Sequence, residues 1–177
     1  MKTSLMTIGS LNVDSERIWC ADKSAANNPL ELYAENGVWD IHILRSLDEL
    51  VLFGPRNIMV AFSHKDFKYD IPQCVSNFYS GKETIKDGGW GVIRDNLLID
   101  TARAVFSTTN PRETGKYPNY DEKIDISWGE KGIELMTGYG DGNYTVYTFV
   151  KQVDEEYDPY LIIADFMIFA DDIEIME

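Results

Sequence analysis

The feature that most constrains this chain is a two-residue alternation of apolar and polar side chains that recurs along its length. Such a period places the apolar side chains on one face of an extended chain, so each alternating segment is predicted to be a half-buried β-strand. The clearest examples are LNVDSERIWCA, GVWDIHIL, KIDISW and YTVYTFV. Two nearly continuous apolar runs, NIMVAFS (57–63) and YLIIADFMIFA (160–170), are expected to be central strands covered on both faces.

Turn-forming sequences separate these segments at short intervals, whereas helix signals are scarce. The best helix candidate is 46–54, with Ser46 as N-cap, Glu49 completing a capping box, and Gly54 and Pro55 as a stop. Closely spaced turns without strand–helix alternation are typical of a sandwich or barrel. We therefore predict a mainly β fold, a single-domain antiparallel β-sandwich or jelly-roll-like barrel with roughly ten strands and at most two short helices.

The 177 residues are enough for one domain, 1–177, with its own core. One weak internal repeat is visible, because residues 13–19 (VDSERIW) and 99–105 (IDTARAV) share the pattern apolar, Asp, Ser or Thr, any residue, Arg, apolar, apolar. The repeat indicates two similar β halves of about 1–88 and 89–177. The loop 109–119, with two prolines and a glycine, is the best candidate for a linker.

The charge of −14 is concentrated in the C-terminal third of the chain. Residues 121–177 hold 15 acidic and 3 basic side chains, whereas residues 1–120 hold 15 and 13. Such a field repels phosphate backbones and attracts basic surfaces, so direct nucleic-acid binding is disfavoured and a basic protein partner is favoured. No apolar run approaches the roughly 20 residues of a membrane span, and the N-terminus lacks the apolar core of a signal peptide. We expect a cytoplasmic protein without membrane contacts.

The glycine-rich stretch GYGDGNYTVYTFV (138–150) is the most motif-like part of the sequence. A phosphate-binding loop needs a helix after the glycines, whereas here a strand pattern follows; a calcium loop needs several oxygen ligands, whereas only Asp141 is in place. We interpret the stretch as a β-hairpin turn in which Asp141 and Gly142 supply positive φ angles. Neither Cys20 and Cys74 nor the two histidines have catalytic or metal-site spacing, so we expect free, buried thiols and predict no catalytic residue, metal or cofactor.

Several of these segments together resemble a family. The order NVDSERIWCAD, NGVWDIHI, GWGVIRDNLLIDTARAVFS and GIELMTGYGDGNYTVYTF is similar to uncharacterised β-rich bacterial proteins of the DUF4241-like type. In these a V-D-S-G segment opens the chain and a G-x-G-D-G-x-Y-x-V-Y hairpin closes it. Glu16 stands where that pattern has glycine. The resemblance implies a mostly β fold and no established activity.

The sequence favours a non-catalytic, acidic protein that occupies the basic surface of another protein. The most concrete form is an immunity or antitoxin-type inhibitor of a basic, nuclease-like toxin or defence effector, since carboxylates can imitate a phosphate row. If strand 160–170 is central, its two acidic flanks are expected to lie close together and form the partner-binding face. The residues predicted to bind the partner are Asp154, Glu155, Glu156, Tyr157, Asp158, Asp171, Asp172 and Glu174.

Two other functions remain open at this point. A small-ligand or carbohydrate-binding β-sandwich module would show a pocket ringed by tryptophan and tyrosine. A hydrolase would show two carboxylates facing each other across a cleft at the separation of a glycosidase pair. Many acidic proteins owe their charge to solubility alone, so the acidic third by itself does not decide among these functions.

Overall fold

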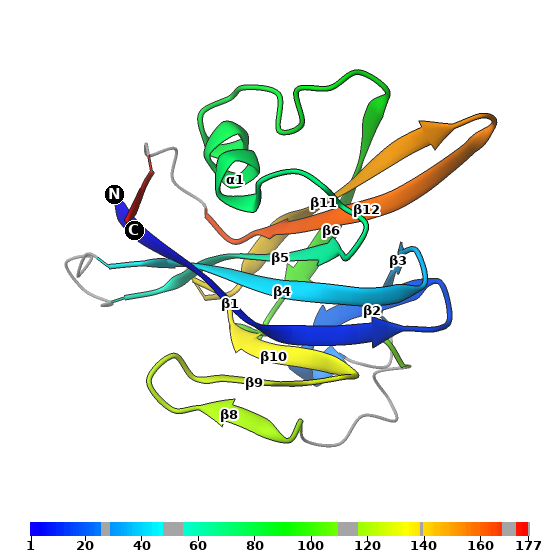
Figure 1. The fold of residues 1–177 in the computed structure, drawn as a ribbon. Helices are drawn as coiled ribbons and strands as arrows, with labels where there is room; N and C mark the ends of the chain where they lie inside the picture. The colour runs from blue at the N-terminus through cyan, green and yellow to red at the C-terminus, as the bar shows by residue number, and fades with distance from the viewer. Residues whose placement is uncertain (26–28, 48–54, 110–116, 139, 168–172, 177) are drawn as a thin grey trace.

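The chain folds into two packed β-sheets, as a computed structural model shows (Figure 1). The structure describes residues 1–25, 29–47, 55–109, 117–138, 140–167 and 173–176. These form thirteen strands, one α-helix and one short 3₁₀-helix, 23–25 (η1). The predicted β-sandwich with at most short helices is therefore confirmed.

The larger sheet, sheet A, has seven strands in the order β13-β1-β4-β5-β12-β11-β6. All of its neighbouring strands are antiparallel except β1 and β13, which run parallel. Its strands are β1 (Lys2–Val13), β4 (Gly37–Ser46), β5 (Asn57–His64), β6 (Trp90–Ile99), β11 (Gly142–Val153), β12 (Glu156–Asp165) and β13 (Glu174–Met176).

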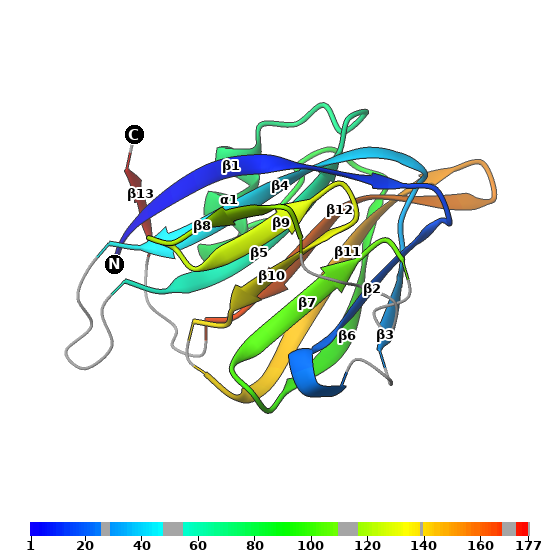
Figure 2. The ribbon, with the colours of Figure 1, turned by 90° about the horizontal axis from the view of Figure 1, so that it is seen from below.

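The smaller sheet, sheet B, has six antiparallel strands in the order β3-β2-β7-β10-β9-β8 and lies across one face of sheet A (Figure 2). Its strands are β2 (Arg17–Asp22), β3 (Leu30–Tyr33), β7 (Arg103–Ser107), β8 (Asn119–Asp121), β9 (Ile126–Gly129) and β10 (Gly132–Met136). A continuous cluster of buried apolar side chains, including Trp39, Phe62, Phe106 and Tyr144, fills the space between the sheets.

The other face of sheet A is covered in part by helix α1 (Ile71–Tyr79), which lies opposite sheet B in Figure 1. Cys74 and Val75 of α1 pack against this face in a second apolar cluster. Sheet A thus has apolar cover on both faces, and all eight residues of its central strand β5 are buried. The prediction of central strands at 57–63 and 160–170 is confirmed for β5 and for the β12 part of the second run.

The predicted helix at 46–54 is wrong where it can be compared. Ser46 is the last residue of β4 and pairs with Thr3, because the sheet partner overrides the local capping signal. Residues 48–54 lie outside the described residues. The helix that does form, α1, has signals of its own in the sequence: Asp70 accepts a hydrogen bond from the main-chain N of Gln73 as N-cap, and Pro72 lies in the first turn.

The predicted hairpin at the glycine-rich stretch is also wrong. Strand β10 before the glycines belongs to sheet B and β11 after them to sheet A, so the segment crosses between sheets and does not join paired strands. Gly138 is needed for close packing, since a Cβ there would collide with the main-chain O of Asn57. Gly140 has φ +87° and its carbonyl accepts a hydrogen bond from the hydroxyl of Tyr144.

The strand pairing repeats between the two halves of the chain. In the first half β1 pairs with β4 and β4 with β5; in the second, β6 pairs with β11 and β11 with β12; β5 and β12 meet in the middle of sheet A. In sheet B, β2 pairs with β3 and β7 pairs with β10 in the same way, and β2 and β7 are neighbours. Two similar halves related by an approximate two-fold axis would produce this arrangement.

The weak sequence repeat marks equivalent turns in this arrangement. Residues 13–17 connect β1 to β2 and residues 99–103 connect β6 to β7, each crossing from sheet A to sheet B. Glu16 and Ala102, at the same position of the repeat, both have left-handed backbones, with φ 57° and 61°. LNVDSERIWCA is therefore two strands joined by a turn, and the prediction of one strand there is wrong.

Candidate functional site

An acidic pocket of about 430 Å³ lies at the end of the sandwich where the loop after β3 meets the start of β12. Both halves of the chain contribute to it. Its lining residues are Glu16, Tyr33, Ala34, Glu35, Glu156, Tyr157, Asp158 and Pro159. Four of these eight residues are carboxylates, drawn from three separate segments of the sequence.

Hydrogen bonds donated by main-chain N–H groups fix these segments to one another. The N of Ala34 donates to the O of Glu16 at 3.2 Å, and the N of Glu16 donates to Oδ1 of Asn36 at 2.8 Å. The N of Glu35 donates to the O of Pro159 at 3.3 Å, which ties the first half to strand β12. The carboxylates therefore project from a backbone that the fold holds in place.

Buried side chains beneath the pocket support the same backbone. The indole Nε1 of Trp39 donates to the O of Glu35 at 2.8 Å, and Nε2 of His64 lies 2.8 Å from the O of Asn36. Nδ1 of His64 faces the main-chain N of Asp66 at 3.0 Å, which assigns the ring proton to Nε2 and makes His64 a donor to Asn36. This histidine has a structural part in the pocket.

The carboxylates of the pocket repel one another. Burial and the nearby charges of Asp158 and Glu16 raise the pKa of Glu35, with Glu156 adding to the effect. None of these four carboxylates forms an ion pair within the described residues. The cation next to them, Arg17, stacks on the ring of Tyr33 at 4.1 Å and donates to the main-chain O of Glu16. The pocket is thus an electronegative site: Arg17 lies at its edge, but its guanidinium forms no ion pair with any of the four carboxylates.

Two tyrosines stand at the rim of the pocket. Tyr33 and Tyr157 are large aromatic side chains that remain 62% and 60% exposed. Exposed aromatic rings beside carboxylates favour a lysine or arginine side chain, because the ring face attracts the cation and covers its methylene stem. In the described part of the chain, no three His, Cys, Asp or Glu side chains are arranged to hold a metal ion.

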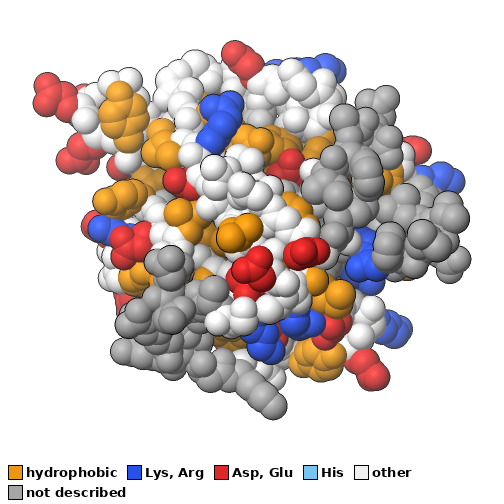
Figure 3. Space-filling view, turned by 180° about the vertical axis from the view of Figure 1, so that it is seen from behind, with side chains coloured by type: hydrophobic (Ala, Val, Ile, Leu, Met, Phe, Trp, Pro, Cys, Tyr) orange, Lys and Arg blue, Asp and Glu red, His pale blue; other side chains and the backbone are white. Residues whose placement is uncertain are grey.

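The structure brings together only part of the predicted partner-binding set. Glu156, Tyr157 and Asp158 line the pocket, and Asp154 and Glu155 form the turn at the tip of the projecting β11–β12 hairpin (Figure 1). Acidic side chains gather at this tip in the space-filling view (Figure 3). Asp171 and Asp172 lie outside the described residues.

The position of Glu174 shows that the two acidic flanks of 160–170 do not lie side by side as expected. It belongs to β13, which pairs with residues 2–4 at the start of β1, whereas the tip of the β11–β12 hairpin lies at the opposite end of sheet A (Figure 1). The separation follows from strand direction, because β12 runs away from its acidic start for ten residues before the chain leaves the sheet.

Five of the eight lining residues were not predicted, and the charged or aromatic ones among them are Glu16, Tyr33 and Glu35. They come from the half of the chain whose charges nearly balance, so the charge distribution does not reveal them. Glu16 is marked by its backbone, which is left-handed, with φ 57°. A carboxylate at a position that favours glycine points to a use for its charge.

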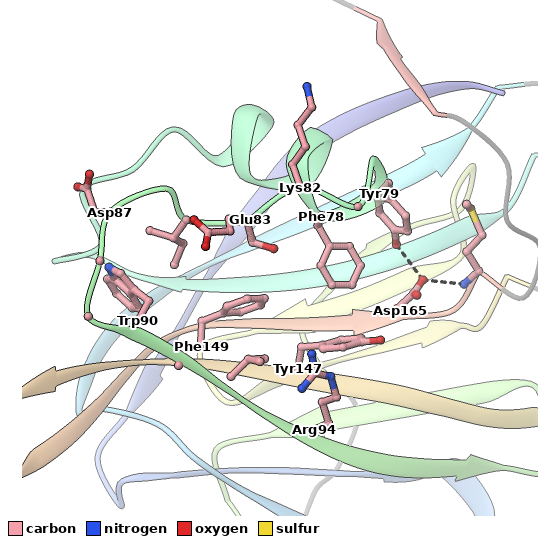
Figure 4. Close-up of a pocket in the computed structure, with 18 residues that line it drawn as sticks. Phe78, Tyr79, Lys82, Glu83, Asp87, Trp90, Arg94, Tyr147, Phe149 and Asp165 are labelled. Carbon is pink, nitrogen blue, oxygen red and sulfur yellow. Dashed lines mark hydrogen bonds between the residues drawn. The ribbon is translucent and has the colours of Figure 1, made fainter.

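A second and larger concavity, of about 1010 Å³, lies between the loop after α1 and the outer face of sheet A (Figure 4). We call it the aromatic cleft. Its lining residues are Phe78, Tyr79, Gly81, Lys82, Glu83, Thr84, Ile85, Asp87, Gly88, Gly89, Trp90, Gly91, Val92, Arg94, Tyr147, Phe149, Asp165 and Met167. A pocket ringed by tryptophan and tyrosine is the feature expected of a ligand-binding module.

A half-buried carboxylate closes one end of the aromatic cleft. Oδ1 of Asp165 accepts hydrogen bonds from the hydroxyl of Tyr79 at 2.9 Å and from the main-chain N of Met167 at 3.0 Å (Figure 4). Burial raises the pKa of Asp165, although these two bonds oppose the shift. Among the described residues, no donor is found for its second oxygen, Oδ2.

Comparison with known proteins adds no further constraint. No family model, no curated protein and no solved structure matches this chain. Of the helices in the described residues, none combines the length and the apolar character that crossing a bilayer requires.

Proposed function

We propose that this protein is a non-catalytic binding protein whose acidic pocket receives a lysine or arginine side chain from the basic surface of another protein. The observation that carries the proposal is the group of four carboxylates that form no ion pair within the described part of the chain, held on a fixed backbone between two exposed tyrosines. Repulsion among Glu16, Glu35 and Asp158 costs folding free energy, which a cation from a partner would recover on binding.

The acidic tip of the β11–β12 hairpin extends this electronegative surface beyond the pocket. Long-range attraction by such a surface speeds the approach of a basic partner, whereas the tyrosines at its centre provide the buried contact area. A surface of this kind suits an immunity or antitoxin-type inhibitor, which covers the phosphate-binding surface of a basic nuclease-like toxin or defence effector. Glu174, at the far end of sheet A, is not part of the surface proposed now.

The test compares two variants that each lose four carboxylates. The pocket variant carries Glu16→Gln, Glu35→Gln, Glu156→Gln and Asp158→Asn. The control carries Asp100→Asn, Glu122→Gln, Glu130→Gln and Glu174→Gln, all exposed and outside the pocket. Each protein is immobilised and exposed to lysate of its source cells at about 50 mM salt, and bound proteins are released at about 500 mM salt.

We expect a basic protein to be retained by the wild type and the control and lost from the pocket variant. Its association rate with the wild type should fall steeply with salt, and its own activity on nucleic acid should stop on binding. Equal retention by the pocket variant and the control would contradict the proposal, since the carboxylates would then be a solvated surface only.

A further inference from the structure

Strand β6 ends sheet A with a long edge that has no strand partner among the described residues. Its ten residues pair with β11 on one side only. Along its first part the side chains of Ile93, Arg94 and Asn96 are exposed, and so is Gly91. The main-chain N–H and C=O groups on the outer side of this edge are therefore open to another extended chain.

The first half of the protein shows what such an edge accepts. Strand β1 is the counterpart of β6, since Leu5 faces Leu44 of β4 as Val92 faces Phe149 of β11. Strand β13 pairs with the start of β1, and the hydroxyl of Thr3 donates to the O of Glu174 at 2.9 Å. The equivalent end of β6, near Trp90, has no partner strand in the described part of the chain.

The aromatic cleft lies directly beside this end. Trp90, Val92 and Arg94 of β6 all line it, since alternate residues of a strand face the same side. A strand added to β6 would present its own alternate side chains to the same cleft, where the rings of Phe149 and Tyr147 form the floor (Figure 4). Main-chain pairing would supply affinity, and the cleft would select the side chains.

We propose that the β6 edge and the aromatic cleft together bind an extended segment of a partner protein. Its cleft-facing residues are large and apolar, and one donor side chain reaches Oδ2 of Asp165. Lys151 faces Trp90 across the sheet, so the acidic tip, Asp154 to Glu156, projects beyond this end of β6. A segment that continues past Trp90 therefore carries a basic residue there. This proposal does not rest on the function proposed for the acidic pocket.

The charge of the chain argues for a different protein, and not a second copy, as the occupant. Two copies paired through β6 would bring two molecules of charge −14 together and place no basic segment beside the acidic tip. A carbohydrate would use the cleft but would leave the main-chain groups of β6 unpaired, so the free edge favours a peptide.

The test selects ligands from a phage library of random twelve-residue peptides on the full-length protein. We expect the enriched peptides to alternate large apolar and polar residues, with a basic residue near one end. A synthetic peptide of the enriched sequence should slow hydrogen exchange of the outward-facing amides between Trp90 and Asn96 at least tenfold. Trp90→Ala should raise its Kd at least tenfold, whereas Tyr120→Ala, at an exposed tyrosine on β8 of sheet B, should leave it unchanged.

A pair of proline variants tests the main-chain pairing itself. Of the neighbours Ile93 and Arg94, one N–H points towards β11 and the other towards the free edge. One of the two variants, Ile93→Pro or Arg94→Pro, removes the outward N–H and should therefore keep the wild-type melting temperature. That variant should lose peptide binding. Unchanged exchange along β6, a β6-mediated dimer in sedimentation, or binding of a hexasaccharide with no enriched peptide would each overturn the proposal.

Discussion

Asp22 is the buried carboxylate that joins the two halves at the level of single residues. Its Oδ1 accepts hydrogen bonds from the main-chain N of Asp100 at 3.0 Å and of Thr101 at 2.8 Å, and from the hydroxyl of Thr101. Its Oδ2 accepts bonds from Ser24. Asp22 thereby caps the turn between β6 and β7 from β2, a strand of the other half.

The ionisation of Asp22 should be visible in stability. Burial acts to raise its pKa, but the hydrogen bonds from Ser24 and Thr101 outweigh burial and hold the pKa at about 2, below its ordinary value of 3.8. A lowered pKa means that the stabilisation is complete above pH 4 and is lost as the pH falls towards 2, an amount of about 2 kcal/mol. Asp22→Asn should lower the unfolding free energy at pH 7 and flatten its dependence on pH between 4 and 2 in urea titrations. An unchanged pH profile would contradict this assignment.

Glu16 has a strained backbone and places its carboxylate in the pocket. Its left-handed backbone costs a non-glycine residue about 1 kcal/mol, so Glu16→Gly should unfold at a slightly higher temperature while weakening the binding of a basic partner. Ala102→Gly, at the equivalent turn, is the matched control: it should gain similar stability with no change in binding. Thermal melts and binding titrations check both, and a loss of stability in Glu16→Gly would show that Glu16 holds the turn.

At the scale of elements, side-chain period was a sound guide to strands and a poor guide to their connections. It located β4, β5, β11 and β12, because each buries at least one face. It could not tell a hairpin from a crossing between sheets at 137–141, since both need glycine and a short polar turn. Helix α1 was overlooked although Asp70 and Pro72 mark its start.

The crossing from β10 to β11 makes a sharp prediction. A Cβ on Gly138 would collide with main-chain atoms of Asn57, which cannot move without disturbing β5. Gly138→Ala should therefore lower the unfolding free energy by about 2 kcal/mol or more. Gly88→Ala, where a Cβ would meet nothing within 4 Å, should leave it within about 0.5 kcal/mol. Denaturant titrations of both variants decide the point, and equal values would refute the close packing.

At the scale of the whole molecule, the candidate site depends on how the halves meet. The acidic start of β12 was predicted as a binding segment from charge alone. Glu16 and Glu35, which line the same pocket, could not be predicted from the sequence. Only the central pairing of β5 with β12 and the loop after β3 bring them to the end of the sandwich where β12 starts. Strand order is set by contacts distant in sequence, which periodicity and local charge do not encode.

Because the two halves pair with each other as similar units, we predict that their order along the chain can be exchanged. The main-chain N of Glu174 donates to the O of Met1 at 2.8 Å, so the two ends of the chain lie close together (Figure 1). A circular permutant that starts at Gly88, joins 177 to 1 through a short glycine–serine linker and ends at Asp87 keeps every strand pair of both halves. We expect it to retain the β spectrum in circular dichroism and an unfolding free energy within about 3 kcal/mol of the wild type. It should bind a basic partner as the wild type does, because the acidic pocket is intact, and should bind β6-edge peptides more weakly, because the cut opens the rim of the aromatic cleft. A permutant that does not fold would mean that the connection from α1 to β6 is needed to bring the halves together.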